Sequence, residues 1–262
     1  FLARTNAVPK EEKILDNGAG ISLLARFDAE IYDAASFKLI AAAIEEFAPL
    51  SLQESWDNAG LCIGSPQQEV HSVLLGFDCT PALVEEAAAR GADMIVTHHP
   101  LIFSGLKKIS PDNEVGLAVT RAISAGIAIY AAHTNADKVL AGVSGAMARR
   151  LGLRDVEVLE AEEGGNGFGA VGNLTEPMSS KEFIEYVKTA FGLSALRCSR
   201  PLEESVSRVA MCGGSGSSLI EAALRSGAQA YICGDVSYHH FFTPDGFMIM
   251  DIGHFEGEVE IV

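Results

Sequence analysis

The sequence predicts an α/β protein built from two related lobes, each with a sheet covered by helices. Helical segments alternate with short β-rich runs from residue 36 onward, which is typical of parallel sheets with helical crossovers. One stretch recurs 136 residues later: residues 83–97 align without a gap on residues 219–233, with a leucine, a glutamate, an alanine and a glycine–alanine pair in register. Chance similarity between alanine-rich helices is the alternative, but in both copies a strand-like run precedes the helix.

The individual elements carry their own start and stop signals. Ser36 can cap a helix that Pro49 ends, and Pro81 opens a second helix that Gly91 closes. A shift of 35 residues reveals a shorter, weaker repeat: residues 118–137 show the same succession of helix, glycine, strand and histidine, with Gly126 matching Gly91 and His133 matching His98. The other expected elements are strands at 73–79, 93–97, 208–214, 230–234 and 247–251 and helices at 179–192 and 219–226.

The domain organisation follows from the repeat and from one glycine-rich stretch. Residues 1–35 show no interpretable pattern, and residues 36–160 form the first predicted lobe. Glycine-rich residues 161–178 are expected to be a linker or surface excursion, and residues 179–262 form the second lobe.

Composition excludes several classes of protein. The formal net charge of −16 would repel a phosphate backbone over most of the surface, so nucleic acid is an unexpected partner. No apolar run approaches the roughly 20 residues of a membrane helix. The five cysteines are scattered and never spaced C-x-x-C, which indicates neither a disulfide framework nor a thiolate metal site. A reducing, cytoplasmic location is expected.

Histidines gather at the ends of the predicted strands. In open α/β sheets, ligands bind beyond the carboxyl ends of the strands. Six of the seven histidines follow strands in four segments, three of which also carry an acidic residue. The residues are His98 and His99; His133 with Asp137; Asp235 with His239 and His240; and His254 with Glu258. Imidazole and carboxylate are the ligands that divalent transition metals take when no thiolate is offered.

The spacing predicts a dinuclear metal centre. His98 and His99 would point oppositely from a strand, but from the loop after it they can serve two ions. His254 and Glu258 share one face if a helix begins there. With Asp137, these residues are the predicted ligands; for each, a turn or capping role is the alternative. His133 has four possible roles: ligand, hydrogen-bond donor to a ligand, general acid, or ordinary strand-end residue.

Other polar segments are open to two interpretations. His239, like His133, is a candidate general acid or base by its location alone, whereas its neighbourhood "YHHFF" can simply be helix packing. Gly213, Gly214, Ser215 and Gly216 lie between a strand and a helix, so they form either an anion cradle or a tight turn. The only tryptophan, Trp56, precedes Asp57 and Asn58, and this segment either lines the site or forms a rigid capped turn.

Taken together, these segments resemble the Nif-three-like dinuclear metal proteins, also described as GTP cyclohydrolase I type 2 homologues. The matching segments, from Phe37 to Glu258, are "SWDNAGLCIG", "VTHHPLIF", "AAHTNAD", "CGGSG", "GDVSYHHFF" and "DIGHFEGE". The resemblance implies two α/β lobes that face each other across a two-metal cleft, and a homohexameric ring. It also implies the ligand set His98, His99, Asp137, His254 and Glu258. Family members normally continue beyond Glu258 with a helix and a strand, whereas this sequence stops four residues later.

The expected function is a metal-dependent hydrolase that acts on a nucleotide-like, anionic substrate through a metal-bound hydroxide. The family name suggests attack on the purine imidazole ring. A phosphoesterase on the same centre is an alternative, and a non-catalytic, metal-binding oligomeric scaffold is another. The two expected divalent ions could be zinc, iron, manganese, nickel or cobalt, because nitrogen and oxygen ligands suit all five.

Overall fold

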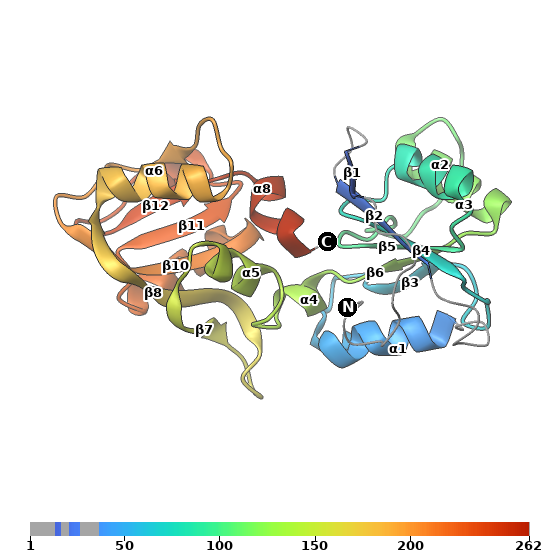
Figure 1. Cartoon of the computed structure of the whole chain (residues 1–262), viewed down its shortest axis with the longest axis horizontal. Coiled ribbons are helices and arrows are strands. Elements are labelled where there is room, and N and C mark those ends of the chain that lie inside the picture. Colours follow the sequence, from blue (N-terminus) through green and yellow to red (C-terminus); the bar gives the residue numbers. More distant parts are fainter. Residues whose placement is uncertain (1–13, 17–20, 27–36, 262) are drawn as a thin grey trace. The chain divides into compact units, whose positions relative to one another are not determined.

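The computed structural model describes residues 14–16, 21–26 and 37–261, which Figure 1 draws as ribbons. The chain divides into two compact units between Ala136 and Asp137. Each unit contains one six-stranded sheet with helices packed against it. The prediction of two α/β lobes with sheets covered by helices is therefore confirmed. Among the described residues, no helix has the length and apolar character needed to cross a lipid bilayer.

The sheet of the first unit has three central parallel strands with antiparallel strands on both sides. Its order is β1-β2-β4-β5-β6-β3, and β4, β5 and β6 are the parallel neighbours. The strands are β1 (Ile14–Asp16), β2 (Ile21–Arg26), β3 (Gly60–Ile63), β4 (Ser72–Gly76), β5 (Met94–Thr97) and β6 (Ala128–Ala131).

Helices cover both faces of this sheet (Figure 1). Helix α1 (Phe37–Phe47) packs on one face through a cluster that includes Met94 and Tyr130. Helices α2 (Pro81–Arg90) and α3 (Glu114–Ala125) pack on the other face against Leu74, Ile95 and Ile129. Successive strand residues point to opposite faces, so two apolar layers form from one set of strands. The short helix α4 (Thr134–Asp137) follows β6.

The second unit repeats this architecture. Its sheet order is β7-β8-β10-β11-β12-β9, with β10, β11 and β12 parallel. The strands are β7 (Arg154–Ala161), β8 (Gly167–Ser179), β9 (Arg197–Cys198), β10 (Ser205–Ser215), β11 (Ala230–Gly234) and β12 (Met248–Asp251). The helices are α5 (Val143–Arg150), α6 (Ser180–Ala190), α7 (Ile220–Arg225) and α8 (His254–Glu258).

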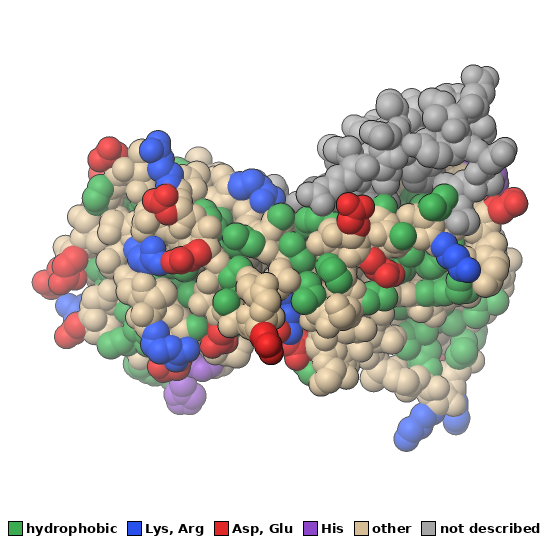
Figure 2. All heavy atoms as spheres, turned by 90° about the horizontal axis from the view of Figure 1, so that it is seen from below, with side chains coloured by type: hydrophobic (Ala, Val, Ile, Leu, Met, Phe, Trp, Pro, Cys, Tyr) green, Lys and Arg blue, Asp and Glu red, His purple; other side chains and the backbone are tan. Residues whose placement is uncertain are grey.

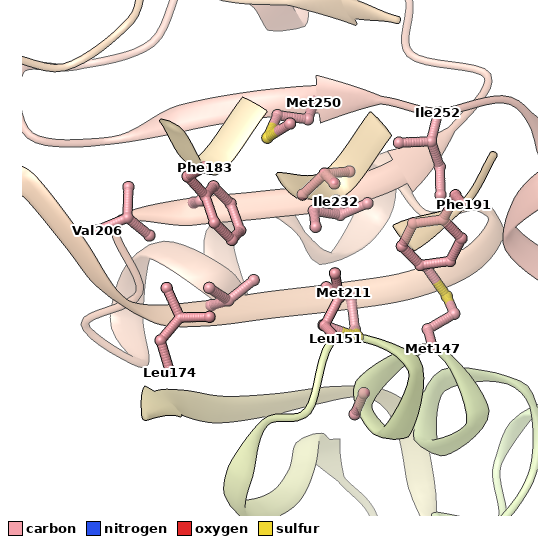
Figure 3. Close-up of a cluster of buried hydrophobic side chains, with 14 of the residues drawn as sticks. Met147, Leu151, Leu174, Phe183, Phe191, Val206, Met211, Ile232, Met250 and Ile252 are labelled. Atoms are coloured by element: carbon pink, nitrogen blue, oxygen red, sulfur yellow. The ribbon is translucent and has the colours of Figure 1, made fainter. Parts of the chain in front are cut away.

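The core of the second unit lies on the face covered by α5 and α6. Figure 3 shows Met147, Phe183, Met211 and Ile232 converging in this cluster. All four side chains have no exposed surface. A buried side chain of this size contributes about 1.5–3 kcal/mol relative to an exposed one. Helix α7 packs on the opposite face, against a second cluster that includes Tyr231.

The two sheets correspond strand by strand, in order and in direction. In the first sheet Leu74 lies opposite Ile95, and in the second Ala210 lies opposite Tyr231. Both pairs are related by the 136-residue shift found in the sequence. The repeat therefore reflects a duplicated α/β architecture rather than chance similarity of alanine-rich helices.

Local capping signals set the boundaries of α2 as predicted, whereas Ser36, the predicted cap of the first helix, lies outside the described residues. The side chain of Thr80 accepts a hydrogen bond from Leu83 N, Pro81 occupies the first turn, and Gly91 ends α2 with φ 65°. A φ in this region is strained for residues with a Cβ, which explains the glycine. Helix α6 begins at a capping box formed by Ser179 and Glu182.

Most of the glycine-rich stretch at 161–178 is a strand rather than the expected linker, whereas residues 162–166 form a largely exposed turn between β7 and β8, which fits the expected surface excursion. Residues 167–179 form β8, which pairs with both β7 and β10. A Cβ on Gly169 would lie 2.9 Å from the carbonyl oxygen of Met211, and one on Gly172 would lie 3.0 Å from that of Arg154. The glycines thus permit close approach of neighbouring strands. Moreover, residues 137–160 belong to the second unit, so the predicted boundary of the first lobe at residue 160 lies too late.

Part of the segment left uninterpreted, residues 1–35, forms strands. Ile14–Asp16 and Ile21–Arg26 pair antiparallel with each other, and β2 continues the sheet beside β4. The rest of this segment lies outside the described residues. On the molecular face shown in Figure 2, acidic and basic side chains are interspersed rather than gathered into a patch of one sign.

Candidate metal centre

Three histidines converge in the first unit at the carboxyl ends of adjacent parallel strands. His98 and His99 directly follow β5, and His133 follows β6 after one intervening residue. One potential ligand nitrogen from each imidazole lies within 4.8 Å of those from the other two. The ring centroids are 4.9 Å apart for His98 and His99, and 5.3 and 5.2 Å from each of these to His133. The prediction placed both tandem histidines in the loop after the strand, and the structure confirms this position.

Each of the three imidazoles is oriented by an oxygen acceptor at Nδ1. The acceptors are Ala132 O for His98, Asp78 Oδ1 for His99 and Asp57 Oδ1 for His133, each at 2.8 Å. A carbonyl oxygen can only accept, so Nδ1 of His98 carries the hydrogen and its Nε2 lone pair points away from the acceptor. Metal-ligating histidines characteristically donate their second ring N–H to such a group, which fixes the tautomer and the ring orientation.

Asp57 is the centre of a polar network beneath His133. Its side chain has no exposed surface. Its carboxylate also accepts hydrogen bonds from Asn58 N at 2.7 Å and from Thr134 N at 3.1 Å, as well as from the Thr134 hydroxyl. Burial raises the pKa of Asp57, but hydrogen bonds from His133 and Thr134 outweigh burial and lower the pKa to about 2. Asp57 is therefore ionised at neutral pH and holds His133 in one orientation. Of the two interpretations of this segment, the capped turn is present, and it also positions a candidate site residue.

The second unit carries the remaining predicted ligands. Helix α8 begins at His254, and its Nε2 lies 3.0 Å from Oε2 of Glu258, one turn later. Asp235 Oδ2 lies 2.7 Å from His254 Nδ1, so this imidazole is anchored like the three in the first unit. The hydrogen bond to Glu258 raises the pKa of His254 to about 9; burial opposes this shift and Asp235 supports it. The predicted helical pairing of His254 and Glu258 is thus observed.

Asp137 and Glu258 both act on the same buried thiol. Burial raises the pKa of Cys212, and the charges of Asp137 and Glu258 raise it further. Both carboxylates therefore lie near the end of β10 in the second unit. The cysteines themselves are buried or half-buried free thiols, as expected from their scattered positions.

The glycines of the predicted anion cradle make room for Glu258. A Cβ on Gly214, whose φ is +59°, would lie 2.1 Å from Oε1 of Glu258 and 3.2 Å from Cε1 of His254. A Cβ on Gly213 would lie 3.1 Å from Cγ of Glu258. Ser215 ends β10 and Gly216 precedes a 3-10 turn. Anion binding by these four residues stays a prediction.

His239 and His240 lie on an exposed 3-10 turn, Tyr238–Phe241. Both side chains are exposed. The ring of His239 packs edge-on to Tyr238 at 5.3 Å. Within the described part of the chain, neither histidine belongs to a group of three potential ligand atoms. An acid–base role for His239 stays a prediction.

Sequence reasoning missed the carboxylates that orient the imidazoles. Asp78 follows β4 and Asp57 lies in the loop before β3, far in sequence from the histidines that they hold. Asp235 was noted at a strand end but not assigned to His254. Only Asp235 carried a usable signal in the sequence. Under the 136-residue shift it corresponds to His99, so the two residues follow equivalent strands of the repeat.

The donor set fits a borderline transition metal. It offers imidazole nitrogen and carboxylate oxygen without a thiolate, which suits zinc, iron, manganese, cobalt or nickel. In the first unit, three imidazoles have Nδ1 engaged by oxygen, so their Nε2 atoms face away from these acceptors, as coordinating nitrogens do. In the second unit, Nδ1 of His254 is engaged by Asp235, and its Nε2 lies 3.0 Å from the carboxylate of Glu258. The fold and the residues at its strand ends define a two-unit α/β protein with groups that can bind a metal.

Comparison with known proteins identifies the family. The profile of Duf34/NIF3 (NGG1p interacting factor 3) matches residues 35–262. The chain belongs to the DUF34/NIF3 family.

Relatives and solved structures agree with this assignment. The chain is 38% identical over 216 residues to a GTP cyclohydrolase 1 type 2 homolog of Lactococcus lactis, covering 80% of this chain and 82% of the relative. It is 35% identical over 221 residues to the protein of that name from Clostridium perfringens, covering 82% and 84%. The crystal structure of a Bacillus cereus protein related to NIF3 superposes with a TM-score of 0.80 at 26% identity, covering 87% of this chain and 90% of that one.

Proposed function

We propose that this protein is a metal-dependent hydrolase that binds two divalent cations and acts on a nucleotide-like substrate. The proposed ligands are His98, His99, Asp137, His254 and Glu258. The observation that carries the proposal is the shared orientation of the imidazoles, each held at Nδ1 by an oxygen acceptor. Relatives named GTP cyclohydrolase 1 type 2 homologs support a nucleotide-like substrate.

The chemistry divides between the cations and the chain. A bound pair of divalent ions lowers the pKa of water from about 15.7 toward about 7 and stabilises developing negative charge. Asp137 and Glu258 supply two negative charges against four positive ones, so an anionic substrate is favoured. His133 holds a proton at Nδ1 toward Asp57, which leaves its Nε2 to accept or donate a proton at the substrate.

The proposal is tested by metal content and turnover measured together. Wild-type protein, His99→Asn and Asp137→Asn are reconstituted with zinc or manganese, and metal per chain is measured by plasma mass spectrometry. Ring opening of GTP and hydrolysis of model phosphodiesters are then assayed. His240→Asn is the matched control, since it removes an exposed imidazole outside the cluster.

The expected result is about two ions per wild-type chain and loss of both metal and turnover in the two ligand variants. Full metal content without turnover on any substrate would support the scaffold alternative instead. Metal below about one ion per chain after reconstitution would contradict both. The expected homohexamer is a separate proposal, and light scattering of the purified protein checks it.

A further inference from the structure

Two large aromatic side chains are exposed beside the histidine cluster of the first unit. Trp56 and Phe103 are each 56% exposed. Their ring centroids lie 5.8 Å apart at an interplanar angle of 42°. Both rings also meet His133 edge-on, at 6.1 and 6.2 Å. Because His133 contacts His98 and His99, the aromatic pair is continuous with the candidate metal ligands.

Two hydrogen bonds anchor the loop that carries Trp56. The Asn58 side chain donates to the carbonyl oxygen of Ile102 at 2.7 Å, which ties the Trp56 loop to the residue before Phe103. Glu54 N donates to Oγ1 of Thr134 at 2.9 Å, which ties the same loop to the residue after His133. The segments that carry both rings are therefore held together before any ligand arrives, and a ligand loses less entropy when it binds a preformed surface.

The chemistry of this surface favours a flat heteroaromatic ring. Aromatic side chains stack on nucleobases because every base presents a π-face, and an edge-on imidazole can add a hydrogen bond to a ring substituent. An aliphatic ligand would gain only the burial of apolar surface here, without stacking. A ring stacked on Trp56 or Phe103 would lie beside His133, the residue that links the pair to the cluster.

We propose that Trp56 and Phe103 form a stacking site for the base of the nucleotide-like substrate. The proposal rests on the proposed function for the substrate class, but base binding itself requires neither metal nor turnover. The two ideas can therefore fail separately.

The chain provides its own probe, because Trp56 is its only tryptophan. Metal-free protein is titrated with guanosine and with guanosine monophosphate while tryptophan fluorescence is recorded. Ribose 5-phosphate, which lacks the base, is the ligand control. Saturable quenching is expected with the first two ligands and not with the third.

Variants then assign the binding to the aromatic pair. Phe103→Ala should weaken binding on the order of 10- to 100-fold, whereas Phe103→Tyr should retain it within about threefold. Ile109→Ala is the matched control, because Ile109 is 58% exposed and outside the pair. Trp56→Ala and Trp56→Phe are compared by equilibrium dialysis with labelled guanosine, and only the alanine variant should lose binding.

Three outcomes would overturn the stacking site: no saturable quenching at millimolar base, equal response to ribose 5-phosphate, or unchanged affinity in Phe103→Ala. Base binding that survives while turnover is absent would instead reject the hydrolase proposal and leave the stacking site intact.

Discussion

Replacement of Asp57 by asparagine tests the polar network that orients His133. The carboxylate accepts hydrogen bonds from His133 Nδ1, Asn58 N, and both the amide and hydroxyl of Thr134. Asparagine has the same shape but only one acceptor oxygen, and its NH₂ group faces a donor whichever way it turns. In Asp57→Asn, at least one buried N–H donor therefore faces the NH₂ group and has no acceptor.

The magnitude follows from the pKa of Asp57. Burial raises this pKa, yet hydrogen bonding lowers it from 3.8 to about 2. This difference corresponds to roughly 2 kcal/mol in favour of the charged form in the folded state. An opposed buried donor adds about 1–3 kcal/mol. We expect Asp57→Asn to destabilise the first unit by about 3–5 kcal/mol at pH 7.

The sign of the pH dependence is set by the depressed pKa. The carboxylate stabilises the folded state fully above pH 3.8, and this contribution disappears as the pH falls through about 2. The difference between wild type and Asp57→Asn should therefore be full at pH 7 and should shrink below pH 3.8.

Urea unfolding followed by tryptophan fluorescence measures this effect, because the single tryptophan lies in the first unit. Asp112→Asn, in an exposed loop, is the control and should change stability by less than about 0.5 kcal/mol. A loss below about 0.5 kcal/mol for Asp57→Asn, or a larger loss that is the same at pH 7 and pH 2.5, would refute the reasoning.

Three further predictions concern the metal ligands. Hydrogen bonding to Glu258 raises the pKa of His254 to about 9, so a metal that binds this imidazole must displace a proton from it. The metal affinity of the protein, measured by calorimetry, should therefore fall about tenfold per pH unit from pH 9 toward neutrality, and a flat profile would contradict this. Gly214→Ala should destabilise the protein by about 1–3 kcal/mol more than Gly227→Ala, because both glycines have positive φ but only Gly214 contacts Glu258. An equal decrease of the melting temperature in the two variants would argue against this contact. Asp78→Asn should weaken metal binding about 10- to 100-fold with little change in melting temperature, and unchanged metal affinity would exclude its orienting role.

Much of the fold could be predicted because its signals are local or periodic. Pro81 and Gly91 bound a helix through backbone geometry that belongs to those residues themselves. The 136-residue repeat indicated two similar units, and strand-end histidines could be recognised because a strand's carboxyl end is fixed by its own apolar run. The candidate ligands could be predicted from the sequence because they follow strands whose ends the sequence indicates.

Tertiary structure decided what depends on distant partners. The carboxylate of Asp57 reaches His133 across 76 residues, and no local pattern encodes such a contact. Residues 161–178 resembled a linker because glycine is equally suited to loops and to crowded strands; only the neighbouring strands β7 and β10 show that the space beside Gly169 and Gly172 is filled. The sequence alone thus determined the parallel strands, the helices between them and their repetition. Long-range packing determined the unit boundary, the antiparallel strands of both sheets and the hydrogen-bond partners of each imidazole.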